Sequence, residues 1–96
     1  MDPKQIEEIM EVIKEFFPEN TSIAISDTNE YIYYQPSKKV DLKIKPGDPI
    51  KEGSAAHKAL TYGQKISTYI EPDVFGVPYF GMSIPLTEEG ETKGAI

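Results

Sequence analysis

The chain has 96 residues, of which 39% are hydrophobic and 27% charged, and its ten basic and sixteen acidic side chains give a net charge of −6. A chain this short holds one hydrophobic core, which predicts a single domain. The acidic balance disfavours nucleic acid as a partner, because neutralising phosphates takes a clustered basic surface. Without cysteine and with one histidine, the sequence excludes disulfides, thiolate zinc sites and multi-histidine metal sites. We therefore expect neither a metal nor a cofactor.

The start of the chain favours a cytoplasmic protein. Met1 leads into Asp2, Pro3 and a charged segment, where a signal peptide would need a basic start and an apolar run. No apolar run approaches the ~18 to 20 residues that a membrane-spanning helix needs. We expect a cytoplasmic chain with no membrane span.

Residues 3–17 are predicted to form an amphipathic helix. Asp2 can cap its first N–H groups, Pro3 suits the first helical position, and Pro18 disfavours helical geometry at the residue before it. Apolar side chains recur at spacings of three and four residues along one side of this segment: Ile6, Ile9, Met10, Ile13, Phe16 and Phe17.

The apolar side of this helix is wider than one covered surface requires. Adding Val12 widens it to roughly 160°, against the ~100° stripe of a helix that lies on one surface. The excess either lies deeper in its own domain or meets a second subunit. The second interpretation predicts a two-fold homodimer contact through the N-terminal helix, made by Ile9, Val12 and Phe16.

The next segments predict a sheet with a long connection. Alternation from Ser22, a polar turn at 27–30 and an aromatic run at 31–35 indicate a hairpin, in which Tyr31 and Tyr33 should share one strand face. Residues 37–52 alternate weakly around Val40 and permit a short edge strand before a Pro/Gly break.

The second half of the chain returns to regular elements. Ser54 can cap a short helix that runs through Tyr62, and Gly63 supplies its left-handed stop. Strands are predicted at 65–70 and 78–86, followed by a turn at 88–90 and a final strand from Thr92. This order predicts an α+β fold: a PAS-like antiparallel sheet of about five strands with an N-terminal helix and a short crossover helix.

Four segments carry a resemblance to a known family. They are Ile44 to Ser54 (IKPGDPIKEGS), Phe75 to Tyr79 (FGVPY), Ser83 to Leu86 (SIPL) and Gly94 to Ile96 (GAI), with Ala59-Leu60 and Gly63 between them. In this order they resemble the PAS/Cache-like N-terminal sensor domain of soluble methyl-accepting chemotaxis transducers, over roughly residues 5 to 96. The resemblance implies a dimeric sensory input module, continued after Ile96 by the rest of its last strand and a helix into a signalling domain.

The chain departs from that pattern because it lacks both the rest of the strand and the helix. It ends on an apolar residue, Ile96, without a polar tail. We therefore expect residues 1–96 to form one C-terminally truncated sensor domain, the front part of a longer signalling protein whose output module the sequence does not identify.

A sheet partly covered by a short helix and a mobile connection predicts a concave site for a small polar or anionic metabolite. Gly81 and Ser83 leave space there. For either residue alone, relief of crowding under a helix is the simpler explanation, whereas the family resemblance favours the pocket. The candidate ligand-binding residues are Tyr33, Ser67, Tyr69, Tyr79 and Ser83. Lysines at 38, 39, 43 and 45 favour an anionic ligand, or else protect an exposed edge strand from pairing.

No motif of the sequence indicates catalysis. Spacings typical of a Ser-His-acid site, a metal site or a nucleotide loop are missing, and the Gly47-Asp48 turn is not followed by a phosphate-loop lysine. His57 is expected to be a partly exposed helical residue rather than a haem ligand or pH sensor. We expect no catalytic residues, and the alternative to a sensor is a ligand-free PAS-like dimerisation module.

Overall fold

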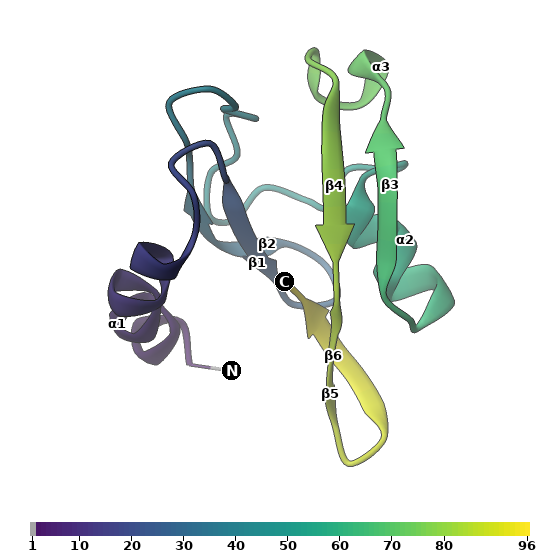
Figure 1. Cartoon of the computed structure of the whole chain (residues 1–96). Helices are drawn as coiled ribbons and strands as arrows, with labels where there is room; N and C mark the ends of the chain where they lie inside the picture. Colours follow the sequence, from purple (N-terminus) through teal and green to yellow (C-terminus); the bar gives the residue numbers. More distant parts are fainter. Residues whose placement is uncertain (1) are drawn as a thin grey trace.

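The computed structural model describes residues 2–96 and has the predicted α+β fold (Figure 1). The helical elements are α1 (Pro3–Ile13), the 3-10 turn η1 (Lys14–Phe16), α2 (Ala55–Tyr62) and α3 (Pro72–Phe75). The strands are β1 (Ile23–Ser26), β2 (Tyr31–Gln35), β3 (Ile66–Ile70), β4 (Tyr79–Ser83), β5 (Pro85–Glu88) and β6 (Glu91–Ala95).

All strand pairs are antiparallel and form two sheets, one of four strands in the order β2-β1-β6-β5 and one of β3 with β4. The strand predicted at 78–86 is divided at Ile84, so that its first half pairs with β3 and its second half with β6. Ile84 itself exchanges two backbone hydrogen bonds with Ile96, at 2.9 and 3.0 Å. The two sheets therefore meet at this kink.

The N-terminal helix is shorter than predicted. The carboxylate of Asp2 accepts a hydrogen bond from the backbone N–H of Lys4 at 3.0 Å, as expected for its N-cap. Regular helix ends at Ile13, and η1 carries the chain to Phe16 because Phe17, before Pro18, adopts extended geometry.

Two features of the connections differ from the prediction. Residues 37–52 form no strand and contribute only an isolated bridge between Glu30 and Pro49. The one-turn helix α3 was not predicted; Pro72 begins it, and Gly76 ends it with a left-handed φ of 86° and donates its N–H to the Pro72 carbonyl at 2.7 Å.

The hydrophobic core lies on both sides of the strands. On one side, α1 covers β1 and β2 through a cluster of Met10, Ile23, Ile25 and Tyr33. On the other side, α2 packs against β3 and β4, where its Ala59 is fully buried. The small residues of α2 let the helix approach the strands closely: an added β-carbon on Gly81 of β4 would lie 3.1 Å from the Cβ of Ala55.

Candidate functional site

A groove lies between the connection that follows β2 and the one-turn helix α3. It has a volume of about 870 Å³ and is lined by residues 42–44, 48–52 and 72–76 together with Tyr31. We call it the crossover groove. Tyr31 is buried and joins the groove to the strands, so the groove reaches from the protein surface to the sheet.

The wall formed by the connection is attached to β2 by backbone hydrogen bonds. The N–H of Tyr31 donates to the Asp48 carbonyl at 2.9 Å, and the N–H of Gly47 donates to the Tyr31 carbonyl at 2.8 Å. The carboxylate of Asp48 also accepts from the N–H of Lys45 at 2.9 Å. Gly47 has a φ of 97°, which favours glycine there. This wall is therefore a defined turn, although it contains no strand.

The opposite wall carries an aromatic side chain. The Phe75 ring of α3 lies 6.0 Å from the Tyr79 ring, measured between centroids, and the Lys51 ammonium lies 6.0 Å from the centre of the Phe75 ring. A cation at this distance from an aromatic face is attracted to it. Lys51 thus spans the groove from one wall to the other.

Beside the groove, near the N-terminus of α2, lies a group of four buried polar residues and the half-buried Tyr79, which we call the inner cluster: Ser26, Tyr31, Ser54, Tyr79 and Ser83. Ser54 caps α2 by accepting the N–H of His57 at 3.1 Å. Ser83 donates to the carbonyl of Ile96 at 3.2 Å. The hydroxyl of Ser26 is fully buried and has no hydrogen-bond partner among the described residues.

Burial in the inner cluster raises the pKa of both tyrosines. Desolvation raises the pKa of Tyr31, and hydrogen bonding from Ser54 and the Lys51 backbone opposes the shift. For Tyr79, desolvation and the nearby Tyr31 raise the pKa to about 12, against hydrogen bonding from the Ala55 backbone. Both phenols are therefore neutral at physiological pH and can donate or accept hydrogen bonds.

This shift predicts a loss of stability in alkaline solution. The pKa of the Tyr79 phenol is near its ordinary value of 10.0 in the unfolded chain and about 12 in the folded one. Its contribution to folding stability is therefore complete below pH 10 and is lost between pH 10 and 12. We expect Tyr79→Phe to reduce this loss of stability, because phenylalanine has no group that ionises. The expected reduction is only about 1 kcal/mol, since solvent screens the partly exposed ring. Urea unfolding at pH 8 and pH 11 measures the change in the free energy of unfolding between the two pH values, with Tyr62→Phe, at an exposed tyrosine, as control. An unchanged pH dependence in Tyr79→Phe would contradict this assignment.

The structure distributes the five predicted ligand-binding residues over different surfaces. Tyr79 and Ser83 lie in the inner cluster, on the strand face that α2 covers. Tyr33 lies on the other face, in the core under α1, where its buried hydroxyl has no hydrogen-bond partner within residues 2–96. Ser67 and Tyr69 are exposed on β3. Only two of the five are thus brought together beside the crossover groove.

A β-bulge explains why Tyr31 was not predicted as a site residue. Ile25 lies opposite Tyr33 whereas Ser26 lies opposite Tyr31, so the register shifts by one residue between these pairs. The expectation that Tyr31 and Tyr33 share a face was therefore wrong, because the bulge turns Tyr31 to the groove side. Ser54 was recognised from the sequence only as a helix cap.

The charge of the groove lining is mixed. Of the four lysines expected near the ligand (Lys38, Lys39, Lys43 and Lys45), only Lys43 belongs to the lining. Lys51 contributes a second ammonium group, and three carboxylates accompany them: Asp48, Glu52 and Asp73. The groove therefore offers both signs of charge to a ligand.

Within residues 2–96, no helix combines the length and the apolar composition needed to cross a membrane. The same residues contain no group of three or more His, Asp or Glu side chains placed to hold a metal ion.

Comparison with known proteins gives one informative similarity. The chain is 32% identical over 79 residues to a protein of Bacillus subtilis (strain 168) named "Putative sensory transducer protein YfmS". The match covers 81% of this chain and 28% of that protein, so the chain spans less than a third of its relative's length. No protein-family model and no solved structure matches the chain. The similarity supports a role in sensory signal transduction.

Proposed function

We propose that the chain is the sensory input domain of a chemotaxis-type transducer, which binds a small metabolite and passes the signal to an output module downstream. The observation that carries the proposal is the crossover groove, whose volume of about 870 Å³ lies within the ~300 to 1,000 Å³ typical of small-molecule sites. The similarity to a sensory transducer supports the signalling part. The proposal places the whole domain, residues 1–96, in the cytoplasm.

The ligand we propose is a small polar metabolite that carries an acidic group. Lys43 and Lys51 can pair with its acidic group, while Tyr31 and the acidic side chains of the lining can accept hydrogen bonds from its donors. Because both phenols of the inner cluster stay neutral, they add hydrogen bonds without adding charge. Ser83 and Tyr79 remain candidate ligand-binding residues where the crossover groove meets the inner cluster.

The route from the groove into the fold runs through α2. The groove residues Lys51 and Glu52 are separated by Gly53 alone from Ser54, which caps α2, and the helix contacts β3, β4 and β6. A ligand that fixes the connection would therefore also fix the start of α2 against the strands. We propose this fixing of α2 against the strands as the signal, since α2 contacts β6, the last strand of the structure.

A thermal-shift experiment with a blocked groove tests the proposal. Val74 belongs to the groove lining, and its Cγ2 atom lies 3.4 Å from where a side chain at Gly53 would begin. A larger residue at position 74 would therefore fill the groove. We expect one compound of a carboxylate-metabolite library to raise the Tm of the unchanged chain and to leave that of Val74→Trp unchanged. The control Val77→Trp, outside the lining, should respond like the unchanged chain.

Two results of this experiment would contradict the proposal. A shift that persists in Val74→Trp would place the ligand elsewhere. The absence of a shift with every compound would favour the alternative function, a ligand-free dimerisation module.

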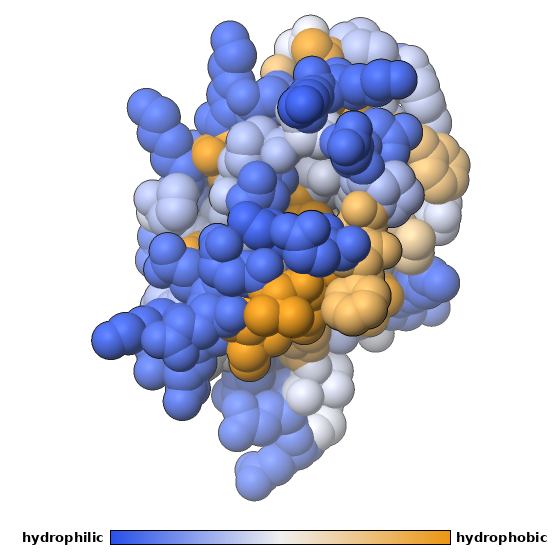
Figure 2. All heavy atoms as spheres, turned by 60° about the vertical axis from the view of Figure 1, so that its left-hand side comes forward, coloured by the Kyte–Doolittle hydropathy of each residue, from blue (hydrophilic) through white to orange (hydrophobic). Residues whose placement is uncertain are grey.

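An exposed apolar surface on the N-terminal helical segment supports the alternative function, a dimerisation module. Ile9, Val12 and Phe16 of the N-terminal helical segment are 56%, 64% and 81% exposed, so they are not buried within the chain. Figure 2, which turns the α1 side forward, shows an apolar area there with hydrophilic residues around it. We propose that these three residues form a homodimer contact, which is compatible with either function.

We propose no catalytic role for the chain. The imidazole of His57 accepts the N–H of Gly53 at 3.1 Å through Nδ1, which occupies this nitrogen in the first turn of α2. Such a bond supports a structural role for the histidine.

A further inference from the structure

A second hollow, of about 450 Å³, lies between α2, the turn that joins β1 to β2, and the start of β6. The helix lines it with His57, Leu60 and Thr61, and β6 contributes Thr92. We call it the threonine pocket. Its volume lies within the ~300 to 1,000 Å³ typical of small-molecule sites. Ile50 belongs to this lining and to that of the crossover groove, so the two cavities share a wall there.

Hydrogen bonds fix the walls of the threonine pocket. The Asp27 carboxylate accepts the N–H groups of Asn29 and Glu30, at 2.7 and 2.8 Å, and thereby holds the turn between β1 and β2. The Asn29 carbonyl accepts the N–H of Ile50 at 3.2 Å, which ties this turn to the connection. On α2, residues 57, 60 and 61 are three and four positions apart, so they share one side of the helix. The pocket is therefore formed before any ligand arrives.

The imidazole of His57 offers this pocket a hydrogen-bond donor. Its Nδ1 accepts the N–H of Gly53 at 3.1 Å, and a ring nitrogen that accepts a hydrogen bond carries no proton. In the neutral imidazole the proton therefore lies on Nε2. Because His57 lines the pocket and its Nδ1 is bonded to the backbone, Nε2–H is the ring group that a ligand can use.

The lining is polar but carries no formal charge. Thr28, Thr61 and Thr92 supply hydroxyls and Asn29 a carboxamide, and within residues 2–96 no Asp, Glu, Lys or Arg belongs to the lining. Hydroxyls and carboxamides both donate and accept hydrogen bonds, as the hydroxyls of a polyol do. The crossover groove, in contrast, is lined by two ammonium groups and three carboxylates. An ionised ligand would lose hydration in the threonine pocket without gaining an opposite charge.

We propose that the threonine pocket binds an uncharged polyhydroxylated compound of about the size of a monosaccharide. The threonine hydroxyls, the Asn29 carboxamide and the Nε2–H of His57 pair with its hydroxyls, and Ile50 and Leu60 contact its C–H groups. This site is distinct from the crossover groove, and its ligand carries no acidic group. The inference therefore goes beyond the proposed function and does not depend on it.

A titration followed by the amide signals of the chain in nuclear magnetic resonance spectra tests the inference, with glucose, myo-inositol and glycerol as probes. We expect at least one of these probes to shift the signals of Asn29, Thr61 and Thr92 saturably, with a Kd of about 1 mM or tighter. Gluconate, which carries a carboxylate, should bind about tenfold more weakly than glucose or worse, because the lining holds no cation for it.

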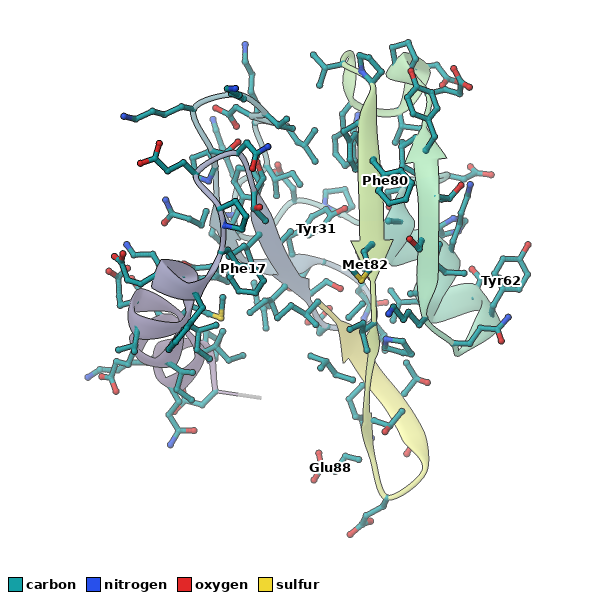
Figure 3. The ribbon with its side chains drawn as sticks, in the orientation of Figure 1. Phe17, Tyr31, Tyr62, Phe80, Met82 and Glu88 are labelled. Atoms are coloured by element: carbon teal, nitrogen blue, oxygen red, sulfur yellow. The ribbon has the colours of Figure 1, made fainter. Side chains whose placement is uncertain are left out.

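Substitutions on α2 locate the bound probe. Thr61→Trp fills the pocket from an exposed position and should abolish the saturable shifts. The matched control is Tyr62→Trp at the next residue, which lies outside the lining, is 66% exposed and extends away from the strands in Figure 3. His57→Asn keeps an acceptor for the N–H of Gly53 but lacks the Nε2–H donor, so we expect it to weaken binding about tenfold.

Each other outcome overturns part or all of the inference. Saturable shifts that persist in Thr61→Trp would place the probe elsewhere, and their loss in Val74→Trp would place it in the crossover groove. Unchanged affinity in His57→Asn would remove the histidine donor from the site. Gluconate that binds as tightly as glucose would contradict an uncharged ligand. No saturable shift with any of the three probes would show that the pocket takes no polyol.

Discussion

A chain that carries both Val12→Glu and Phe16→Glu will sediment as a monomer at concentrations where the unchanged chain is a dimer. The two side chains are 64% and 81% exposed, and we propose that a two-fold contact covers them. In such a contact each substitution would occur twice and bury four uncompensated carboxylates near one another. We expect dissociation to be favoured at least 100-fold, on the order of 3 kcal/mol.

The control adds the same charge elsewhere on the surface. Gln64→Glu with Asn20→Glu changes two exposed positions outside the N-terminal helical segment and should leave the dimer intact. Sedimentation equilibrium over a wide concentration range measures both variants. A monomeric unchanged chain at high concentration, or a dimeric Val12→Glu/Phe16→Glu variant, would contradict the proposed interface.

Ile70→Ala will destabilise the domain by about 2 to 5 kcal/mol, because the side chain is 1% exposed and its removal leaves a cavity. Its Cγ1 atom lies 3.5 Å from where a Gly81 side chain would begin, so Ile70 fills the space between β3, β4 and α2. A small domain with a stability of ~5 to 15 kcal/mol would lose a large part of it.

Urea unfolding measures the effect of Ile70→Ala, with Tyr69→Ala as the matched control on the same strand. Tyr69 is 53% exposed and its truncation removes few contacts, so we expect its cost to be well below that of Ile70→Ala. Figure 3 shows how the side chains of β3 and β4 extend to either side of their ribbon. Equal costs for the two variants would show that α2 does not pack on this face.

The elements that the sequence predicted are those with strong local signals. Asp2, Pro3 and Pro18 bound the first helix as expected, with its last turn tightened to a 3-10 turn. Ser54 and Gly63 bound the second, with Gly63 at a φ of 65°. Caps and breakers act on neighbouring residues, so they can be identified without knowledge of the tertiary fold.

The candidate site could not be predicted in the same way, because strand register decides it. One bulge separates Tyr31 from Tyr33 and places them on opposite faces of β2. Ser67 and Tyr69 alternate correctly along β3, but the exposed face of that strand is determined by where α2 packs. The groove wall at Lys43 to Asp48 depends on hydrogen bonds to β2, which no local pattern indicates.

The inner cluster also combines residues from distant parts of the chain. Ser26 comes from β1, Ser54 from the start of α2 and Ser83 from β4, and each is at most 3% exposed. A serine in a sequence predicts caps and turns more readily than burial. The burial of these hydroxyls therefore depends on how the strands pair, which the sequence does not indicate.

Hydrogen exchange across residues 36–63, with and without the library of carboxylate metabolites, tests the central claim most directly. This stretch holds one wall of the crossover groove and the start of α2, and it has no strand of its own. We expect fast exchange along the connection before α2, residues 36–53, in the free chain, and new protection with one compound, extending from the groove wall to Ser54. A stretch already as protected as the strands, and unchanged by every compound, would contradict a ligand-binding sensor.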